Sequence, residues 1–306
     1  MSKEELDKLT TEKRNANTLY LDKLPVAQVL KIMNNENEKV QVAIGQVLPK
    51  IEKAVQSIVD SFNHKGRLIY IGAGTSGRLG VLDAAECVPT FGSPPEMVIG
   101  LIAGGDQAMT KAVEGAEDDE KLGESDLKGI KLTPRDTVVG ISASGRTPYV
   151  IGGLIYAKQI GAETVALSCN EDSAISELAE ISIEVIVGPE ILTGSTRLKA
   201  GTAQKLVLNM LSTASMIQIG KVYQNLMIDI NVTNEKLEDR ATRIISNITE
   251  ASYEQSHEAL IASHYNVKNA VVMLSKNVNF DESQRILEEA DGFIYKIIEG
   301  EAKENE

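Results

Sequence analysis

A glycine-rich turn at residues 72–77, with the sequence GAGTSG, has the residue types needed to bind an anion. Glycines let the backbone approach a ligand closely, and the first turn of a following helix offers unpaired N–H groups and the positive end of its dipole. Gly74, Thr75 and Ser76 are therefore candidate binding residues. The same GxGxxG spacing also occurs in dinucleotide sites, which need an acidic residue at the end of the second strand, where Asp106 is a displaced candidate.

A second turn, SASGRTP at residues 142–148, has three hydroxyl side chains and a glycine, and it places a proline in the first turn of the next helix. Two such turns at the carboxyl edge of one sheet fit a compact monophosphate better than a pyrophosphate. The alternative is that these hydroxyl groups only cap helices. The candidate binding residues of this turn are Ser142, Ser144, Gly145 and Thr147.

Both turns follow short apolar runs rich in β-branched residues, which alternate with helical patterns. The predicted strands are 67–71, 97–102, 137–141, 164–167 and 181–187, and the predicted helices lie near 76–87, 106–120, 147–160, 171–178 and 198–220. Nearly continuous apolar strands indicate a parallel sheet that is buried on both faces. The pattern therefore predicts an α/β fold with a five-stranded, parallel, flavodoxin-like sheet.

Helical patterns flank this central part of the chain. Residues 26–61 have helical periodicity, and Pro49 within them predicts either a kink or a boundary. After Lys221 no strand pattern recurs, and amphipathic helices are predicted at 234–250, 253–264, 267–275 and 281–299. We predict four parts, which are an N-terminal helical segment 1–56, the sheet domain 57–221, connecting helices 222–249 and a small helical C-terminal domain 250–306.

The composition excludes several classes of protein. A net charge of −13 over 306 residues argues against nucleic acid or an anionic membrane surface as the main partner. No apolar run is long enough for a membrane span, and the N-terminus lacks the apolar centre of a signal peptide. Two cysteines cannot form a disulfide framework, and no metal-binding spacing is present. We therefore expect a cytoplasmic protein without a metal site.

Longer motifs resemble a known family. GAGTSG together with SASGRTPY is similar to the sugar isomerase (SIS) domain, which binds phosphosugars. The longer strings resemble N-acetylmuramic acid 6-phosphate etherases, whereas the glucokinase regulatory protein shares the TGSTRLKAG signature but is a much longer chain with two SIS domains. These strings are GAGTSGRLGVLDAAEC at 72–87, LIAGG at 101–105, VEGAED at 113–118, TGSTRLKAGTAQK at 193–205 and NEKL at 234–237.

The resemblance implies a reaction of cell-wall recycling and amino-sugar metabolism. The lactyl ether of N-acetylmuramic acid 6-phosphate would be cleaved with water to N-acetylglucosamine 6-phosphate and D-lactate. In the ring-opened sugar the C1 aldehyde acidifies the C2 proton, so a base can remove that proton while an acid protonates the departing ether oxygen. Water then adds to the unsaturated aldehyde. This carbon–oxygen lyase chemistry requires no metal or cofactor.

The resemblance carries the catalytic roles onto Glu86 and Glu117. We assign Glu86 as the acid and Glu117 as the C2 base, although the opposite assignment is also open. The small apolar neighbours Ala84, Ala85 and Cys87 predict that Glu86 is buried, which would raise its pKa. Glu117 lies in an acidic run, where most charges are simply solvated.

The spacing of these residues suggests a shared active site. Glu86 lies ten residues after Ser76, about 15 Å along an unbroken helix, which exceeds the span from phosphate to C3 in a hexose 6-phosphate. Either the helix ends or bends early, or Glu86 serves a phosphate bound by the partner chain of a homodimer. Lys236 is a candidate cation for the substrate, and Arg197 or Lys199 could add positive charge near the phosphate.

Two other functions remain open from the sequence. A SIS-type aldose–ketose isomerase would also remove the C2 proton but would leave the ether intact. A phosphosugar-sensing regulator would bind the sugar without a working acid. The variant Glu86→Gln separates these classes, because only an etherase would lose lactate release.

Overall fold

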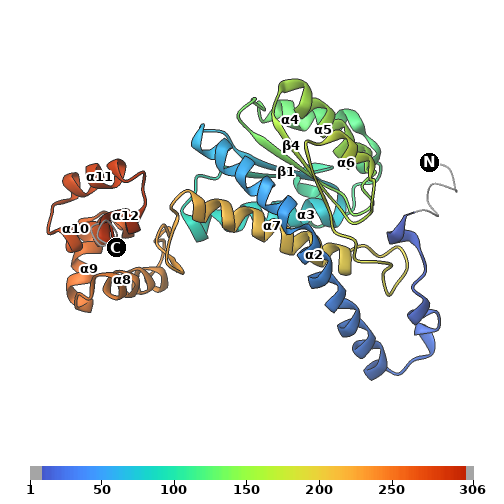
Figure 1. The fold of residues 1–306 in the computed structure, drawn as a ribbon, viewed down its shortest axis with the longest axis horizontal. Helices are drawn as coiled ribbons and strands as arrows, with labels where there is room; N and C mark the ends of the chain where they lie inside the picture. The colour runs from blue at the N-terminus through green and yellow to red at the C-terminus, as the bar shows by residue number, and fades with distance from the viewer. Residues whose placement is uncertain (1–8, 301–306) are drawn as a thin grey trace. The chain divides into compact units, whose positions relative to one another are not determined.

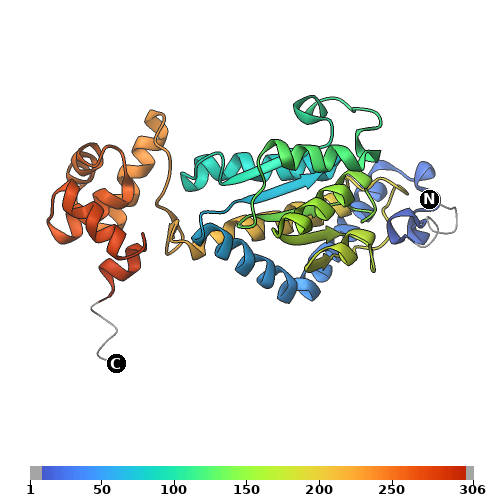
Figure 2. The same ribbon diagram turned by 90° about the horizontal axis from the view of Figure 1, so that it is seen from above.

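The computed structural model of the chain describes residues 9–300, and residues 1–8 and 301–306 lie outside that description. Within it the chain forms two compact units (Figures 1 and 2). The sheet unit runs to Ala85 and continues over Glu96–Ser212, while the helical unit comprises Glu86–Pro95 and the chain from Thr213 onward. This division is coarser than the four predicted parts, whose boundaries at 57, 222 and 250 stay predictions.

The sheet unit is built on one parallel five-stranded sheet. Its strands are β1 (Leu68–Gly72), β2 (Val98–Ile102), β3 (Thr137–Ile141), β4 (Glu163–Ser168) and β5 (Ile181–Glu184). The strand order is β2-β1-β3-β4-β5 with parallel pairing throughout, which confirms the predicted flavodoxin-like α/β fold. The predicted fifth strand is too long by three residues, because only residues 181–184 pair with β4.

Helices cover both faces of the sheet (Figures 1 and 2). Successive side chains of a strand point to opposite faces. Ile69 and Ile71 of β1 pack in one core cluster with residues of the helix Pro148–Ile160, whereas the Tyr70 hydroxyl donates to Asp83 of the helix Gly74–Phe91 on the other face. The helices of the first face are α4 (Glu120–Gly129), α5 (Pro148–Ile160) and α6 (Ala174–Leu178), and those of the second are α2 (Val26–Asn63), α3 (Gly74–Phe91) and α7 (Lys199–Gln218).

The longest of these helices is α2, which runs without a break through Pro49. The boundary that this proline suggested is therefore absent. Its Ser61 hydroxyl is 2.7 Å from that of Thr137 in β3, which anchors the end of the helix to the sheet. Like every other helix in residues 9–300, α2 lacks the apolar length that a membrane crossing needs.

The helix predicted near 106–120 is wrong. Two 3₁₀ segments, Gly105–Met109 and Ala116–Asp118, stand there instead, and α4 begins only at Glu120. The reason lies in the backbone, since Gly105 has φ of 67° and Gly115 has φ of 77°, values that a right-handed helix does not contain. The result is an irregular segment after β2.

Between residues 222 and 300, the helical unit has five short helices around its own apolar core, to which Ile245, Leu260 and Val271 contribute. The predicted helix 281–299 is two helices, because positive φ at Asp291 and Gly292 ends the first. The prediction that no strand follows Lys221 is also wrong, since a hairpin of two-residue strands does, and strands that short carry no periodicity. These elements are β6 (Val222–Tyr223), β7 (Leu226–Met227), α8 (Glu235–Thr249), α9 (Tyr253–Ala262), α10 (Val267–Lys276), α11 (Phe280–Glu289) and α12 (Ile294–Ile298).

Candidate active site

The two predicted anion-binding turns lie at neighbouring strand ends. Gly72, the last residue of β1, is paired with Ile141 at the end of β3 and with Ile102 at the end of β2. The segments that follow these three strands therefore leave the same edge of the sheet. In open parallel sheets ligands bind at this edge, where the crossovers diverge to opposite faces.

The turn after β1 is tight and needs its glycines. Gly74 begins α3 with φ of 52°, a conformation that favours glycine. A Cβ atom on Gly77 would lie 2.6 Å from the carbonyl oxygen of Gly72, so a side chain there would force strand and helix apart. The first turn of α3 is thus held directly against the end of β1.

A small pocket of about 210 Å³ opens beside this turn. The structure brings two of the predicted residues, Gly74 and Glu117, together in its wall, and the Glu117 side chain is exposed. Neither Thr75 nor Ser76 lines the pocket. The lining residues are Ala73, Gly74, Arg78, Ala103, Ala108, Lys111, Ala112, Val113, Glu114, Gly115, Ala116 and Glu117.

The turn after β3 holds a cluster of hydroxyl groups. The Ser142 Oγ atom lies 2.8 Å from Oγ1 of Thr147 and 3.3 Å from Oγ of Ser144, and it accepts a hydrogen bond from the backbone N–H of Gly145 at 3.0 Å. Thr147 is the N-cap residue of α5, yet its side chain makes no cap hydrogen bond. The simple capping alternative therefore fails for Thr147, and the cluster offers several hydroxyl donors in one place.

Arg146 in the same turn was missed by the sequence reasoning. Its Nε atom is buried and has no hydrogen-bond partner in the described part of the chain. Gly145 before it has φ of 71°, and a Cβ atom there would lie 2.2 Å from Cβ of Ser173. A buried donor without a partner is costly unless a ligand or water completes it.

Ser76 is buried, and its hydroxyl donates to Oε1 of Gln204 in α7 at 3.0 Å. The Nε2 atom of Gln204 is buried without a partner among residues 9–300. Rotating this amide by 180° would let Nε2 donate to the Ser76 oxygen and would free the Ser76 hydrogen for a ligand. The binding roles of Thr75 and Ser76 stay predictions, and Gln204 becomes a residue that orients Ser76.

The prediction that Glu86 is buried is wrong for the described chain. Glu86 is exposed, because it shares the outer face of α3 with Leu82, which is 50% exposed, and with Ala85, whereas Cys87 faces inward at 2% exposure. Small apolar neighbours do not reveal which face of a helix a residue occupies. The alternative of an early helix end is also wrong, since α3 continues to Phe91.

Asp83 of α3 holds this helix in place. Its carboxylate accepts hydrogen bonds from the Tyr70 hydroxyl at 2.8 Å, from Nδ2 of Asn209 at 2.7 Å and from the Ser212 hydroxyl at 3.2 Å. It is buried and fully engaged by β1 and α7. Asp83 therefore fixes the register of α3 against the sheet rather than reacting with a ligand.

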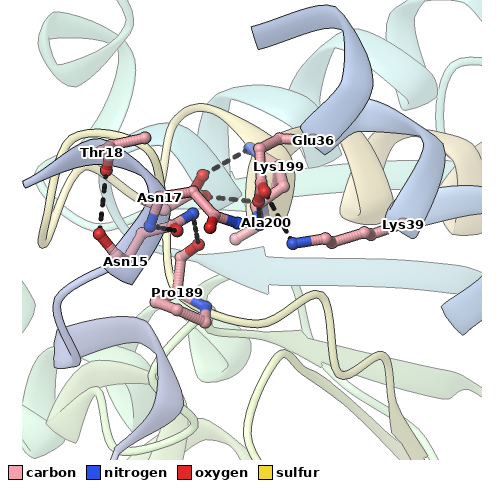
Figure 3. A network of polar contacts seen from close by, with 9 residues as sticks. Asn15, Asn17, Thr18, Glu36, Lys39, Pro189, Lys199 and Ala200 are labelled. Atoms are coloured by element: carbon pink, nitrogen blue, oxygen red, sulfur yellow. Dashed lines mark hydrogen bonds and ion pairs between the residues drawn. The ribbon is translucent and has the colours of Figure 1, made fainter. Parts of the chain in front are cut away.

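Lys199 does not supply positive charge to a ligand. Its side chain is 2% exposed, and its Nζ atom lies 2.6 Å from Oε2 of Glu36 on α2 (Figure 3). Lys39 contacts the other oxygen of Glu36 at 2.6 Å. Burial by itself would raise the pKa of Glu36, but the hydrogen bonds from Lys199 and Lys39 outweigh burial and hold that pKa below its ordinary value.

The start of α7 is fixed by a second buried carboxylate. Glu190 accepts hydrogen bonds from the backbone N–H groups of Lys199 at 3.0 Å and Ala200 at 2.9 Å. A carboxylate suits this position because the N-terminus of a helix is electropositive. Arg197, just before the helix, is exposed and stays available to a ligand.

Lys236 lies in the first turn of α8, in the helical unit, and is exposed. The side chain of Asn234 accepts from the backbone N–H of Leu237, so the NEKL segment caps this helix. Lys236 is not among the residues that line the pocket of Glu117. Its contact with a substrate stays a prediction.

Comparison with known proteins identifies the family. The chain matches the N-terminal SIS domain of glucokinase regulatory protein over residues 50–158, the SIS domain over 123–214 and the C-terminal lid domain of glucokinase regulatory protein over 224–290. It is 60% identical to N-acetylmuramic acid 6-phosphate etherase 2 of Lactiplantibacillus plantarum, covering 96% of this chain and 99% of that one. The chain belongs to the N-acetylmuramic acid 6-phosphate etherase family. The etherase of an Exiguobacterium species is 58% identical, with 96% of this chain and 100% of that one covered, and etherase 2 of Enterococcus faecalis is 58% identical, with 94% and 98% covered.

Membership of the etherase family confirms the resemblance seen in the motifs and the SIS fold expected from it. In this etherase-family chain the pocket also contains two cations, Arg78 and Lys111, that the sequence reasoning missed. Arg78 follows directly on GAGTSG in the first motif and could have been noticed there. Lys111 could not, because it lies outside every quoted motif and reaches the pocket through the irregular segment after β2.

Proposed function

We propose that this chain cleaves the lactyl ether of N-acetylmuramic acid 6-phosphate with water, giving N-acetylglucosamine 6-phosphate and D-lactate. Relatives at 55–60% identity over nearly the whole chain are named N-acetylmuramic acid 6-phosphate etherases. The structural observation that carries the proposal is the joint presence of Glu117 and Gly74 in one pocket at the carboxyl edge of the sheet. Neither an isomerase nor a phosphosugar-sensing regulator is favoured by a specific feature of the site.

The proposed reaction begins at the ring-opened sugar. Glu117 takes the proton from C2, and the electron pair of that C–H bond moves into the system conjugated with the C1 aldehyde. The bond between C3 and the ether oxygen then breaks, and Glu86 gives its proton to the departing lactate oxygen. Water adds to C3 of the unsaturated aldehyde while a proton returns to C2. The reaction is that of a carbon–oxygen lyase, and it needs opposed protonation states at two carboxyl groups.

The phosphate is assigned to the two turns at the sheet edge. The backbone at Gly74 leaves room for close approach, because the space beside its Cα atom is open, and neutral hydroxyl groups together with helix N-termini suit a phosphate without requiring a charged partner. The hydroxyl cluster of the second turn supports this assignment, because its members bond to one another and can reorient toward an anion. The assigned residues are Gly74, Thr75, Ser76, Ser142, Ser144, Gly145 and Thr147.

The working form is a homodimer with a shared active site. Ten residues of continuous helix separate Ser76 from Glu86, about 15 Å, so one sugar phosphate does not span from the first turn to the Glu86 of the same helix. We assign Glu86 to the site whose phosphate the partner chain holds, and Lys236 as a further cation for the substrate. A dimer would also cover the exposed face of α3. The protein would act in the cytoplasm, in amino-sugar metabolism and cell-wall recycling.

The first experiment measures D-lactate after incubation with N-acetylmuramic acid 6-phosphate, in the presence of a chelator and without added cofactor. We expect lactate and N-acetylglucosamine 6-phosphate in equal amounts. Lactate release should be lost in Glu86→Gln while the phosphosugar still binds. Absence of lactate from the wild-type chain contradicts the etherase proposal, and an aldose-to-ketose conversion would instead identify an isomerase.

A mixing experiment tests the shared site. Glu86→Gln and Glu117→Gln are each inactive alone in this proposal, but a mixed dimer has one site with both intact glutamates. Random subunit exchange at equal amounts should therefore restore about one quarter of the wild-type activity, because half the dimers are mixed and each has one working site of two. Mixing that restores nothing would place both glutamates of a site on one chain.

A further inference from the structure

The pocket of Glu117 contains two cations for which the described part of the chain provides no carboxylate partner. Arg78 is half-buried on α3, one helical turn after Gly74, and Lys111 is exposed on the irregular segment after β2. Among residues 9–300, neither forms an ion pair. Glu114 and Glu117 line the same pocket and balance the formal charge of these cations, but neither forms an ion pair with them among residues 9–300, so both cations stay free to contact a ligand.

The backbone aims the guanidinium of Arg78. Its Nε atom donates to the carbonyl oxygen of Met109 at 3.0 Å, and Met109 ends the 3₁₀ segment that follows β2. With Nε used in this way, the two terminal nitrogens of the guanidinium remain for a ligand. That pair of parallel N–H groups matches the two oxygens of a carboxylate.

We infer that Arg78, assisted by Lys111, binds the carboxylate of the lactyl group and selects for the ether substrate. This inference rests on the proposed function. The substrate carries two anions, and the hydroxyl-rich turns account only for the phosphate. The lactyl carboxylate still needs a partner.

The covalent structure of the substrate places this second anion near Glu117. The base acts on C2, the lactyl oxygen is attached to the adjacent C3, and the carboxylate carbon is two bonds beyond that oxygen. The carboxylate therefore lies within a few ångströms of the Glu117 carboxylate, and the two anions repel. A guanidinium in the same pocket removes that repulsion and holds the lactyl group while the C3–O bond breaks.

Arg78 would also explain how the site distinguishes its substrate from other sugar phosphates. N-acetylglucosamine 6-phosphate has the same phosphate and the same C2 proton but no carboxylate. Arg78 contributes to binding the ether and little to binding this product, so the product leaves more easily. Arg78 is a specificity-determining residue in this assignment, whereas Glu117 acts on both compounds.

The test compares two reactions in Arg78→Met and Arg78→Lys. The first reaction is D-lactate release from N-acetylmuramic acid 6-phosphate, and the second is exchange of the C2 hydrogen of N-acetylglucosamine 6-phosphate with deuterated water. We expect kcat/KM for lactate release to fall about 10- to 100-fold in Arg78→Met, as for loss of a hydrogen-bonded charge, with a smaller loss in Arg78→Lys and in Lys111→Met. Exchange should fall less than about threefold, because its substrate lacks the carboxylate.

Arg135→Met is the matched control, because it removes an exposed guanidinium just before β3, at the opposite edge of the sheet. It should change neither reaction. Equal losses of release and exchange in both Arg78 variants, or no loss of lactate release, overturn the carboxylate subsite. If the wild-type chain performs the exchange but releases no lactate, both the etherase proposal and the carboxylate subsite are overturned. If the wild-type chain releases lactate normally but the Arg78 variants lose both reactions equally, only the subsite is overturned.

Discussion

Two regions of the sheet unit place cations near carboxylates, but only one of them joins the charges in an ion pair. At the start of α7, Lys199 is buried and paired with Glu36 at 2.6 Å. In the pocket after β2, Arg78 and Lys111 share a wall with Glu117 and form no ion pair in residues 9–300. The first region uses its charges to fix the fold, and the second keeps them for a ligand.

The physical reason for the difference is hydration. A charge removed from water loses several kcal/mol of solvation unless a partner replaces the water, so a buried Lys199 without Glu36 would destabilise the fold. A cation at the wall of an open pocket stays hydrated and needs no partner until a ligand displaces the water. An unpaired cation in a pocket is therefore a better indicator of binding than a buried ion pair.

The largest effect on activity is expected for a substitution of Glu117 in the pocket. Glu117→Gln should lower lactate release about 10²- to 10⁴-fold, because it removes the base that takes the C2 proton. The melting temperature should not change, because the Glu117 side chain is exposed. Steady-state kinetics and thermal unfolding measure the two quantities.

Glu120→Gln is the control for this variant, since Glu120 is an exposed carboxylate at the start of α4 and does not line the pocket. It should retain nearly full activity. Comparable losses in the two variants would show that the acidic run acts through its overall charge rather than through Glu117.

The next largest effect is a loss of stability when the buried ion pair of Lys199 and Glu36 is broken. Lys199→Met should lower the free energy of unfolding by about 3 kcal/mol, because it leaves the Glu36 carboxylate buried with only Lys39 as a partner. Urea unfolding followed by circular dichroism measures this loss. The double variant Lys199→Met/Glu36→Leu should recover much of it, because no buried charge then remains unpaired. A double variant that is less stable than the single one would contradict this account.

The ion pair of Glu36 and Lys199 also predicts that the free energy of unfolding depends on pH. Since the folded pKa of Glu36 lies below its unfolded value, the pair stabilises the fold above an unfolded pKa of about 4.3, and this contribution is lost as the pH falls through the folded pKa. The folded pKa of Asp136 is also lowered. Burial by itself would raise that pKa, but the hydrogen bonds from Arg67 and Thr133 outweigh burial. Unfolding free energies between pH 7 and pH 3 should fall less steeply in Lys199→Met than in the wild-type chain. Parallel curves would contradict the assignment to Glu36.

The smallest effect is expected for Lys39→Met. Lys39 contacts the same carboxylate as Lys199, but its side chain is 51% exposed. Exposed ion pairs contribute about 0–1 kcal/mol, so the free energy of unfolding should change by less than about 1 kcal/mol. A loss as large as that of Lys199→Met would show that burial does not decide the contribution of a cation here.

The sequence itself determined the sheet. Apolar, β-branched runs have one stable solution when helices separate them, a parallel sheet covered on both faces, and the five strands and their order followed from that. The turns at residues 72–77 and 142–148 were also found from local chemistry, because each one combines glycines, hydroxyl groups and a following helix within seven consecutive residues or fewer. The family followed from motifs that are contiguous in the chain.

Only the tertiary structure decided how the charged residues are used. Glu86 and Cys87 are neighbours in sequence, yet one is exposed and the other buried, because a helix turns its faces by about 100° per residue. Lys199 looked available until α2 brought Glu36 to it from 163 positions earlier in the chain. Arg78 and Lys111 meet in one pocket because glycines with positive φ break the helix expected after β2. Partners that are distant in sequence leave no local pattern, so the roles of these charges depend on the folded chain.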